Sequence, residues 1–117
     1  MSRSYRLYLT DIQRAIERIN VIMSTLDETA FRNGVILTDG ILFNLMTIGE
    51  AAKNIPQHIR DLMPEIDWSE IGKFRDLVAH HYFGLNMNKV WEIVQTDLPE
   101  LADQIESLMA LIKDIDE

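Results

Sequence analysis

The chain has 117 residues, 47% hydrophobic and 26% charged, which is long enough for a single globular domain spanning 1–117 with a modest core. It has no cysteine, which excludes a disulfide framework and thiolate metal ligands, and it shows neither an apolar run of transmembrane length nor a signal-peptide pattern. We therefore expect a cytoplasmic protein with no membrane contact, and the formal net charge of −8 disfavours a long basic groove for nucleic acid.

Apolar residues at helical spacing predict an all-α fold, an antiparallel bundle of four to five helices. The first predicted helix begins after a cap at Ser4 and ends near 29–33, before Gly34. Its apolar face is Tyr5, Tyr8, Leu9, Ile12, Ala15, Ile16, Ile19, Ile22, Met23 and Leu26. Arg14 and Arg18 lie one turn apart and indicate a solvated charged face.

The second predicted helix follows a cap at Thr38 or Asp39 and carries Gly49 in its middle. Glycine inside a helix costs about 1 kcal/mol relative to alanine, so we expect another helix to pack closely there. Glu50 and Lys53, three positions apart, are interpreted first as an ordinary ion pair within this helix.

A short third helix is predicted over 57–63, where Pro64 stops it. His58 stands alone on this segment and is interpreted as a surface residue. Trp68 is predicted to anchor the core, and Ser69 to cap the fourth helix. That helix is expected to turn Ile71, Phe74, Val78 and also Leu77 toward the core.

After the fourth helix, Gly84 turns the chain and Asn86 is predicted to cap the last helical region. Within that region Pro99 either kinks one long helix or opens a second one after a cap at Asp97. No repeat, low-complexity segment, strand pattern or linker divides the chain.

The fourth helix carries the densest group of chemically capable side chains, namely Arg75, Asp76, His80, His81 and Tyr82. Each helical step turns a side chain by about 100°, so Asp76 and His80 share one face and can hydrogen-bond. Arg75 and His80 are about 140° apart and do not converge on one small target. Two copies of the chain facing each other would let each copy supply one flank of a shared cleft.

These residue types suit phosphodiester chemistry. Imidazole has a pKa of about 6.5 and can take a proton from one oxygen and return it to another, while a guanidinium presents a donor fork that matches phosphate oxygens. Asp76 would fix a histidine tautomer or orient Arg75, His81 would support the site or remain a surface residue, and the Tyr82 hydroxyl would bind or be modified. His80 and His81 point to different sides and the glycines are scattered, so we expect neither a metal nor a nucleotide cofactor.

Arg75, His80 and Tyr82 form an Arg-x-x-x-x-His-x-Tyr motif, which resembles that of the HEPN superfamily. More narrowly, it resembles the HepT toxins, which pair with MntA-type nucleotidyltransferase antitoxins. The likeness covers roughly residues 5–112, and it includes Ile48-Gly49-Glu50-Ala51-Ala52-Lys53, Ile66-Asp67-Trp68, Val90-Trp91 and Leu98-Pro99.

The resemblance implies an all-helical homodimer that acts as a metal-independent ribonuclease on RNA. Carried over by position, Arg75 would hold the phosphate and stabilise its developing charge, and His80 would be the general base or acid. Tyr82 would accept AMP groups when the antitoxin silences the toxin. The resemblance also places Glu50 and Lys53 near the cleft, as the alternative to a pair within their own helix.

One residue departs from the family pattern, because Asp76 stands where many members have asparagine. Charge is also unevenly distributed: 73–91 carries a net charge of +2 and 94–117 a net charge of −6, with histidine neutral. We therefore expect a small, local RNA footprint, and the acidic exterior suits a basic protein partner.

Two functions from different classes stay open. One is a ribonuclease toxin whose site forms across a homodimer and whose partner silences it through Tyr82. The other is a non-catalytic helical module that binds a nucleotidyltransferase, nucleotide or RNA through the same polar cleft. The intact motif favours the first, and the excess of acidic residues favours the second.

Overall fold

The computed structural model describes residues 3–81 and 84–115, and every regular element within these ranges is helical. In chain order the elements are α1 (Tyr5–Met23), α2 (Glu28–Arg32), α3 (Ile36–Lys53), α4 (Gln57–Arg60), α5 (Trp68–His81), α6 (Met87–Glu92), the π-helix η2 (Ile93–Asp97) and α7 (Leu98–Leu111). The predicted all-α class is confirmed.

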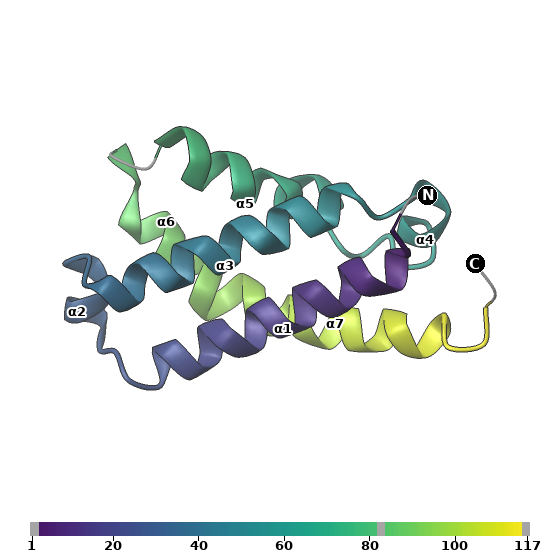
Figure 1. Cartoon of the computed structure of the whole chain (residues 1–117), viewed down its shortest axis with the longest axis horizontal. Helices are drawn as coiled ribbons and strands as arrows, with labels where there is room; N and C mark the ends of the chain where they lie inside the picture. Colours follow the sequence, from purple (N-terminus) through teal and green to yellow (C-terminus); the bar gives the residue numbers. More distant parts are fainter. Residues whose placement is uncertain (1–2, 82–83, 116–117) are drawn as a thin grey trace.

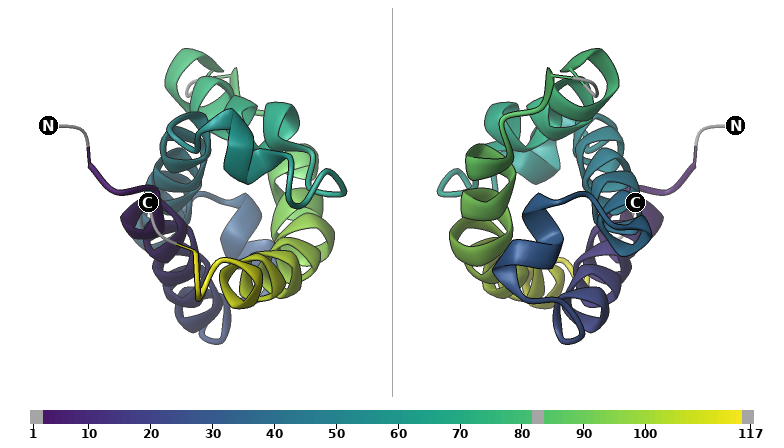
Figure 2. Two further views of the ribbon diagram at one scale, coloured as in Figure 1. Left: turned by 90° about the vertical axis from the view of Figure 1, so that its right-hand side faces the viewer. Right: turned by 90° about the vertical axis from the view of Figure 1, so that its left-hand side faces the viewer.

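The bundle is built from α1, α3, α5 and the continuous run α6–η2–α7, with the short α2 and α4 at its opposite ends (Figure 1). α3 packs against α1 on one side and α5 on the other, and α7 packs against α1. Figure 2 shows the long segments end-on around a common core. Among the described residues, no helix combines the length and apolar composition needed to cross a membrane.

The core takes one face from each segment, as the apolar spacing predicted. Trp68, Ile71, Phe74 and Val78 are buried on α5, and Leu77 is half-buried beside them. The largest fully buried side chains are Phe31, Leu9, Ile12, Ile19, Ile41, Leu45, Ile48, Ile59, Ile93, Leu98, Ile105 and Leu108. Burying such a side chain contributes about 1.5–3 kcal/mol, so this shared core is what holds α5 and its polar residues in place.

The first helix is shorter than predicted, and its expected end near 29–33 is wrong. α1 starts after the predicted Ser4 cap but stops at Met23, and a second helix begins after Asp27, whose side chain accepts from the Ala30 backbone N–H at 2.7 Å. Aspartate is a strong N-cap, and here it starts a new helix inside a stretch whose apolar spacing continues.

The predicted cap of the second helix is also wrong. α3 begins at Ile36, so Thr38 and Asp39 lie in its first turn and not before it. Thr38 is buried, and its hydroxyl donates to the Phe31 carbonyl at 3.2 Å. This bond ties α3 to α2, a tertiary role that spacing along the chain does not reveal.

Two further boundaries differ from the expectation. α4 ends at Arg60, not at residue 63, and Arg60 donates back to the carbonyls of Ile55 and Ala52 at 2.8 and 2.9 Å. α5 begins at Trp68, and it is Asp67, not Ser69, whose side chain accepts from the first-turn N–H of Glu70 at 3.0 Å. The predicted surface position of His58 is confirmed.

The last helical region is one run that passes through a π-turn. Asn86 caps it as predicted, accepting from the backbone N–H groups of Asn88 and Lys89. Asp97 is helical and makes no side-chain cap bond, so of the two alternatives at Pro99 the structure shows one distorted helical run and not a second helix after a cap at Asp97. Pro99 has no N–H and its ring crowds the carbonyl four residues earlier, which explains why i→i+5 bonding over 93–97 replaces the α pattern.

Candidate functional site

The site forms where α3 and α5 touch. A Cβ added at Gly49 would lie 2.5 Å from the backbone nitrogen of Arg75 and 2.9 Å from its Cβ, closer than real Cβ contacts allow. Glycine therefore lets the two helices meet backbone to backbone, which confirms the close packing predicted at this position. The contact also fixes the position of Arg75 along the axis of α3.

Four charged side chains bridge this contact. Lys53 Nζ on α3 donates to Asp76 Oδ1 on α5 at 3.0 Å, and Arg75 Nη1 lies 3.5 Å from the same oxygen. Arg75 Nε lies 3.7 Å from Glu50 Oε2. Glu50 and Lys53 therefore contact residues of α5. This matches the position near the cleft that the resemblance implied, and the first interpretation, an ion pair within α3, is wrong.

The electrostatics of Asp76 follow from these neighbours. The hydrogen bond from Lys53 lowers the pKa of Asp76 below its ordinary value, and the guanidinium of Arg75 acts in the same direction. The ionised carboxylate is thus the form that the cluster favours. Of the two alternatives for Asp76, orientation of Arg75 matches this geometry, because its described contacts are with Lys53 and Arg75.

The Arg75 guanidinium stays available to a ligand. Its side chain is 42% exposed, and its contacts with Glu50 and Asp76 are longer than a well-formed charged hydrogen bond. Two carboxylates and two cations balance one another in this cluster. The excess positive charge of 73–91 comes from Lys73 and Lys89, which line a separate groove between α5 and α7. A phosphate would therefore have to displace carboxylates from Arg75, and exposed pairs of this kind are weak.

The histidines lie further along α5. His80 is exposed and four residues beyond Asp76, while Arg75 lies on a different part of the helix circumference. One chain therefore does not bring Arg75 and His80 to a single point. His81 is the last residue of α5, but its side chain lies outside the described structure, as does the whole of Tyr82.

A stripe of exposed residues on α3 leads to this cluster. Ile36, Phe43 and Glu50 are seven positions apart, so they share one helix face, and Ile36 and Phe43 are 86% and 65% exposed. Neither apolar residue was predicted to belong to a site. The one feature of the sequence that could have identified these two residues is that they fall outside the apolar repeat of α3, which includes Ile41, Leu45 and Ile48.

The described residues offer no evident metal centre, since no three His, Asp or Glu side chains among them come together to hold a metal ion. A separate groove lies between α5 and α7, and neither Arg75 nor His80 lines it. Arg75 therefore lies outside this groove, at the α3–α5 contact.

Comparison with known proteins gives consistent matches. Residues 12–108 match the family described as "Ribonuclease HepT-like". A protein of Thermococcus cleftensis named "Probable ribonuclease HepT" is 37% identical over 108 residues, covering 92% of this chain and 98% of the relative. A "Putative RNase" of Methanocaldococcus jannaschii is 32% identical over 115 residues, covering 98% and 97%.

A longer relative from the same organism, named "Gamma-glutamylcyclotransferase and putative RNase", is 32% identical over 109 residues. These residues are 93% of this chain but 49% of that relative, so the chain spans about half its length. No solved structure matches the chain.

Proposed function

The chain belongs to the HepT-like ribonuclease family, and on this premise we propose that it is a ribonuclease toxin that cleaves RNA without a metal ion. The observation that carries the proposal is the half-exposed guanidinium of Arg75, held at the α3–α5 contact on the same helix as the exposed His80. A charged donor fork and an imidazole are sufficient for transfer at a phosphodiester.

In the proposed reaction His80 takes the proton from a ribose 2′-hydroxyl, whose oxygen then attacks the adjacent phosphorus. The bond from phosphorus to the 5′-oxygen breaks, an imidazolium returns a proton to that oxygen, and the products are a cyclic phosphate and a 5′-hydroxyl end. Arg75 stabilises the negative charge that grows on the phosphate oxygens during attack. Asp76, anchored by Lys53, would orient Arg75.

The proposed site is composite and needs a homodimer. Within one chain Arg75 and His80 diverge, whereas a two-fold interface supplies a second copy of each. The exposed apolar stripe of Ile36 and Phe43 runs along α3 toward Glu50 and Arg75. Packing two stripes together with their α3 helices parallel would bring the two clusters face to face. We assign the dimer interface to this stripe.

Silencing by a nucleotidyltransferase partner is the final part of the proposal. Tyr82 follows His80 by two residues, and the resemblance implies that its hydroxyl accepts AMP groups. Bulky, negatively charged AMP beside the motif would exclude an RNA phosphate by size and by repulsion.

The catalytic roles are tested by expressing the chain alone and by incubating the purified protein with cellular RNA, with and without EDTA. We expect slowed growth and RNA cleavage that EDTA does not stop. Arg75→Ala and His80→Ala should each lower the cleavage rate by about 10²–10⁴-fold. The matched controls are Arg14→Ala and His58→Ala, exposed residues of the same types on other helices, and both should cleave like the wild type.

The same experiment separates the alternative, a non-catalytic helical module that binds a nucleotidyltransferase, nucleotide or RNA. The net charge of −8, together with the carboxylates of Glu50 and Asp76 beside Arg75, favours that alternative. A wild-type chain that leaves growth and all cellular RNA unaffected would refute the ribonuclease and favour this alternative. Cleavage that EDTA abolishes would instead refute the metal-free reaction while keeping the ribonuclease.

The interface is tested with Phe43→Glu, which places a charge in the middle of the stripe. We expect a dimer for the wild type and a monomer without cleavage activity for this variant, measured by sedimentation and RNA assay. Leu111→Glu is the matched control, because Leu111 is 56% exposed on α7, a helix that packs against α1 and η2. A Phe43→Glu variant that stays dimeric and active would place the interface elsewhere.

The silencing step is tested by intact mass measurement after co-expression with a neighbouring nucleotidyltransferase. Additions of AMP mass should map to Tyr82, and Tyr82→Phe should remain toxic in the presence of the partner. Tyr8→Phe serves as the control and should still be silenced. AMP found only on another residue would remove Tyr82 from the scheme.

A further inference from the structure

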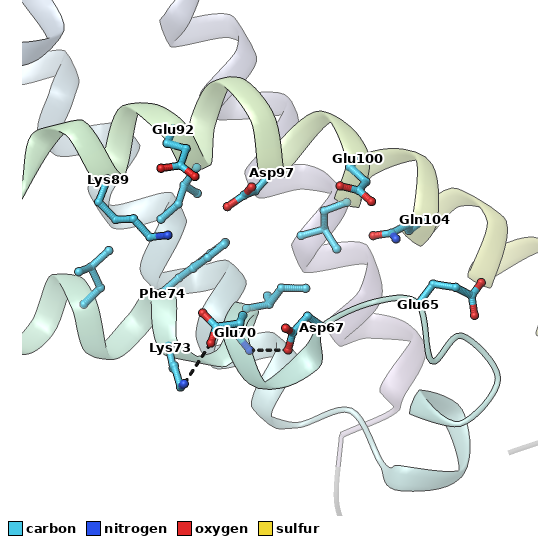
Figure 3. Close-up of a pocket in the computed structure, with 14 residues that line it drawn as sticks. Glu65, Asp67, Glu70, Lys73, Phe74, Lys89, Glu92, Asp97, Glu100 and Gln104 are labelled. Carbon is cyan, nitrogen blue, oxygen red and sulfur yellow. Dashed lines mark hydrogen bonds and ion pairs between the residues drawn. The ribbon is translucent and has the colours of Figure 1, made fainter.

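A groove of about 510 Å³ separates α5 from the run α6–η2–α7, on the side of α5 away from α3 (Figure 3). Its floor is apolar and is formed by the buried Ile71, Phe74, Ile93 and Leu101 with the half-buried Leu77. The bundle is thus tightly closed between α3 and α5 but open between α5 and α7. A volume of this size accommodates several side chains of another molecule.

The walls of the groove are strongly acidic. Lys73 and Lys89 are its two cationic side chains, and Lys73 is already paired with Glu70 at 3.1 Å. Against them stand carboxylates from both walls, namely Glu65, Asp67, Glu70, Glu92, Asp97 and Glu100. Figure 3 shows Asp97, between Glu92 and Glu100, directed toward the space between the helices. The groove therefore carries negative charge that its own lysines do not balance.

The position of Asp97 has a structural cause. The π-turn forced by Pro99 ends at this residue, and its side chain makes no capping bond with α7. Burial raises the pKa of Asp97, the carboxylates of Glu92 and Glu100 act in the same direction, and the ammonium of Lys89 opposes them. A cation supplied from outside would relieve this unfavourable environment.

We propose that this groove is the docking site for a basic, partly apolar segment of a protein partner. Lysine or arginine side chains of the segment would meet the carboxylates of the walls, and an apolar side chain would cover Leu77 and the floor between them. Complementary charge around an apolar strip is how amphipathic segments are held in grooves. The proposal does not rest on ribonuclease activity.

Other occupants fit the groove less well. RNA would bring its phosphates against six carboxylates, which repel them. A metal ion lacks a suitable ligand group, because the described residues bring no three candidate ligands together. A small polyamine would match the charge but would leave the apolar floor uncovered, and a second copy of the chain would have to present exposed arginines such as Arg14 and Arg18.

The groove and the charged cluster lie on different sides of α5. Glu70, Lys73, Phe74 and Leu77 form one stripe of the helix, spaced three or four apart, and line the groove. Arg75, on the α3 side, belongs to the charged cluster. A partner can therefore occupy the groove without covering the α3–α5 face, so docking and chemistry use separate surfaces of one helix.

The test is a fluorescence anisotropy titration of the full chain with a labelled peptide of four Lys-Lys-Leu repeats. We expect saturable binding that weakens with salt, and about tenfold weaker binding for the double variant Glu92→Gln/Glu100→Gln. The matched control is Glu17→Gln/Glu106→Gln, which removes the same charge at exposed helix positions outside the groove. Its affinity should stay within about twofold of the wild type.

Two further measurements keep the outcome decisive. A Lys-Lys-Ser peptide of equal length should bind at least fivefold more weakly, since it cannot cover the apolar floor, and amide chemical shifts on the wild-type chain should change at Leu77, Lys89 and Asp97. Equal losses in both double variants, equal binding of the two peptides, or displacement by spermidine at peptide-like concentrations would overturn the proposal. Dimerisation that fills the groove would overturn it in favour of a second copy.

Discussion

The two sides of α5 are built in opposite ways. Toward α3 the helices meet backbone to backbone at Gly49, and opposite charges bridge the contact, with Lys53 on Asp76 and Glu50 near Arg75. Toward α7 the helices stand apart around a groove whose carboxylates outnumber its lysines. One side is closed by shape and paired charge, and the other is held open with unbalanced charge.

The contrast shows which side of α5 requires exact placement of a side chain. The closed side fixes Arg75 through the backbone, so the position of the guanidinium follows from helix packing and not from a long side chain alone. The open side has six carboxylates and two lysines, an excess of negative charge suited to receiving a basic partner. Both properties depend on the register of α5, which its buried face sets through Ile71, Phe74 and Val78.

The largest expected effect comes from closing the space at Gly49. Gly49→Ala places a methyl group against the Arg75 backbone, which cannot move aside, so we expect the free energy of unfolding to fall by about 1–3 kcal/mol. If the α3–α5 contact positions Arg75, RNA cleavage should fall more than the folded fraction does. Denaturant unfolding and the cleavage assay measure the two quantities.

Gly72→Ala is the matched control on α5 itself. An added Cβ there would meet the flexible Cγ of Lys53 at 3.3 Å, not backbone, so alanine should be neutral or stabilise by up to about 1 kcal/mol through helix propensity. Equal stabilisation of both variants would mean that the backbone contact at Gly49 does not hold the site.

The features of α5 that depend on neighbouring residues in the sequence could be predicted, and most of those that depend on contacts between helices could not. The helical class and the core face of α5 followed from the spacing of apolar residues. The close contact followed from Gly49, a glycine inside a predicted helix. The boundary errors had local or tertiary causes that spacing hides: Asp27 starts a helix within a continuing apolar pattern, and Thr38 bonds to Phe31 in another helix.

The candidate site was accessible only in part. Arg75, Asp76 and His80 are near neighbours in sequence, and their helix places them by simple rotation. Pairing across α3 and α5 depends on the register between helices, so the partners Glu50 and Lys53 were indicated by resemblance and not by spacing. The groove was not predictable, because it is a separation between helices that no pattern along the chain records.

The next effect in size compares two neighbouring residues of α5. Val78 is buried in the closed core, whereas Leu77 is half-buried and lines the groove. Val78→Ala should lower the free energy of unfolding by about 2 kcal/mol, and Leu77→Ala by about 1 kcal/mol although it removes more carbon atoms. Equal or reversed losses in denaturant titrations would show that the groove side is packed as tightly as the core.

A smaller effect tests the unbalanced charge of the groove. Because the folded pKa of Asp97 is raised, its contribution to stability is fully present below the unfolded pKa of about 3.9 and is lost as pH rises through the folded pKa. Asp97→Asn keeps the uncharged form, so at neutral pH it should stabilise by up to about 0.5 kcal/mol, and this gain should vanish in acid.

Asp103→Asn controls for the change in net charge, because Asp103 is exposed on α7 and does not line the groove. Thermal unfolding of both variants across pH gives the comparison. A loss of stability at neutral pH for Asp97→Asn alone would mean that the ionised carboxylate has a favourable partner in the fold.

The smallest effect has the opposite sign and belongs to the closed side. The folded pKa of Asp76 is lowered chiefly by the Lys53 hydrogen bond, so its contribution to stability is present above the unfolded pKa and is lost as pH falls through the folded pKa. Lys53→Met should move the pKa of Asp76 upward in a carboxyl titration followed by nuclear magnetic resonance, whereas Lys73→Met, outside the cluster, should leave it in place. An unchanged pKa in Lys53→Met would show that the ammonium does not hold Asp76, and the two sides of α5 would then differ in shape but not in how their carboxylates are compensated.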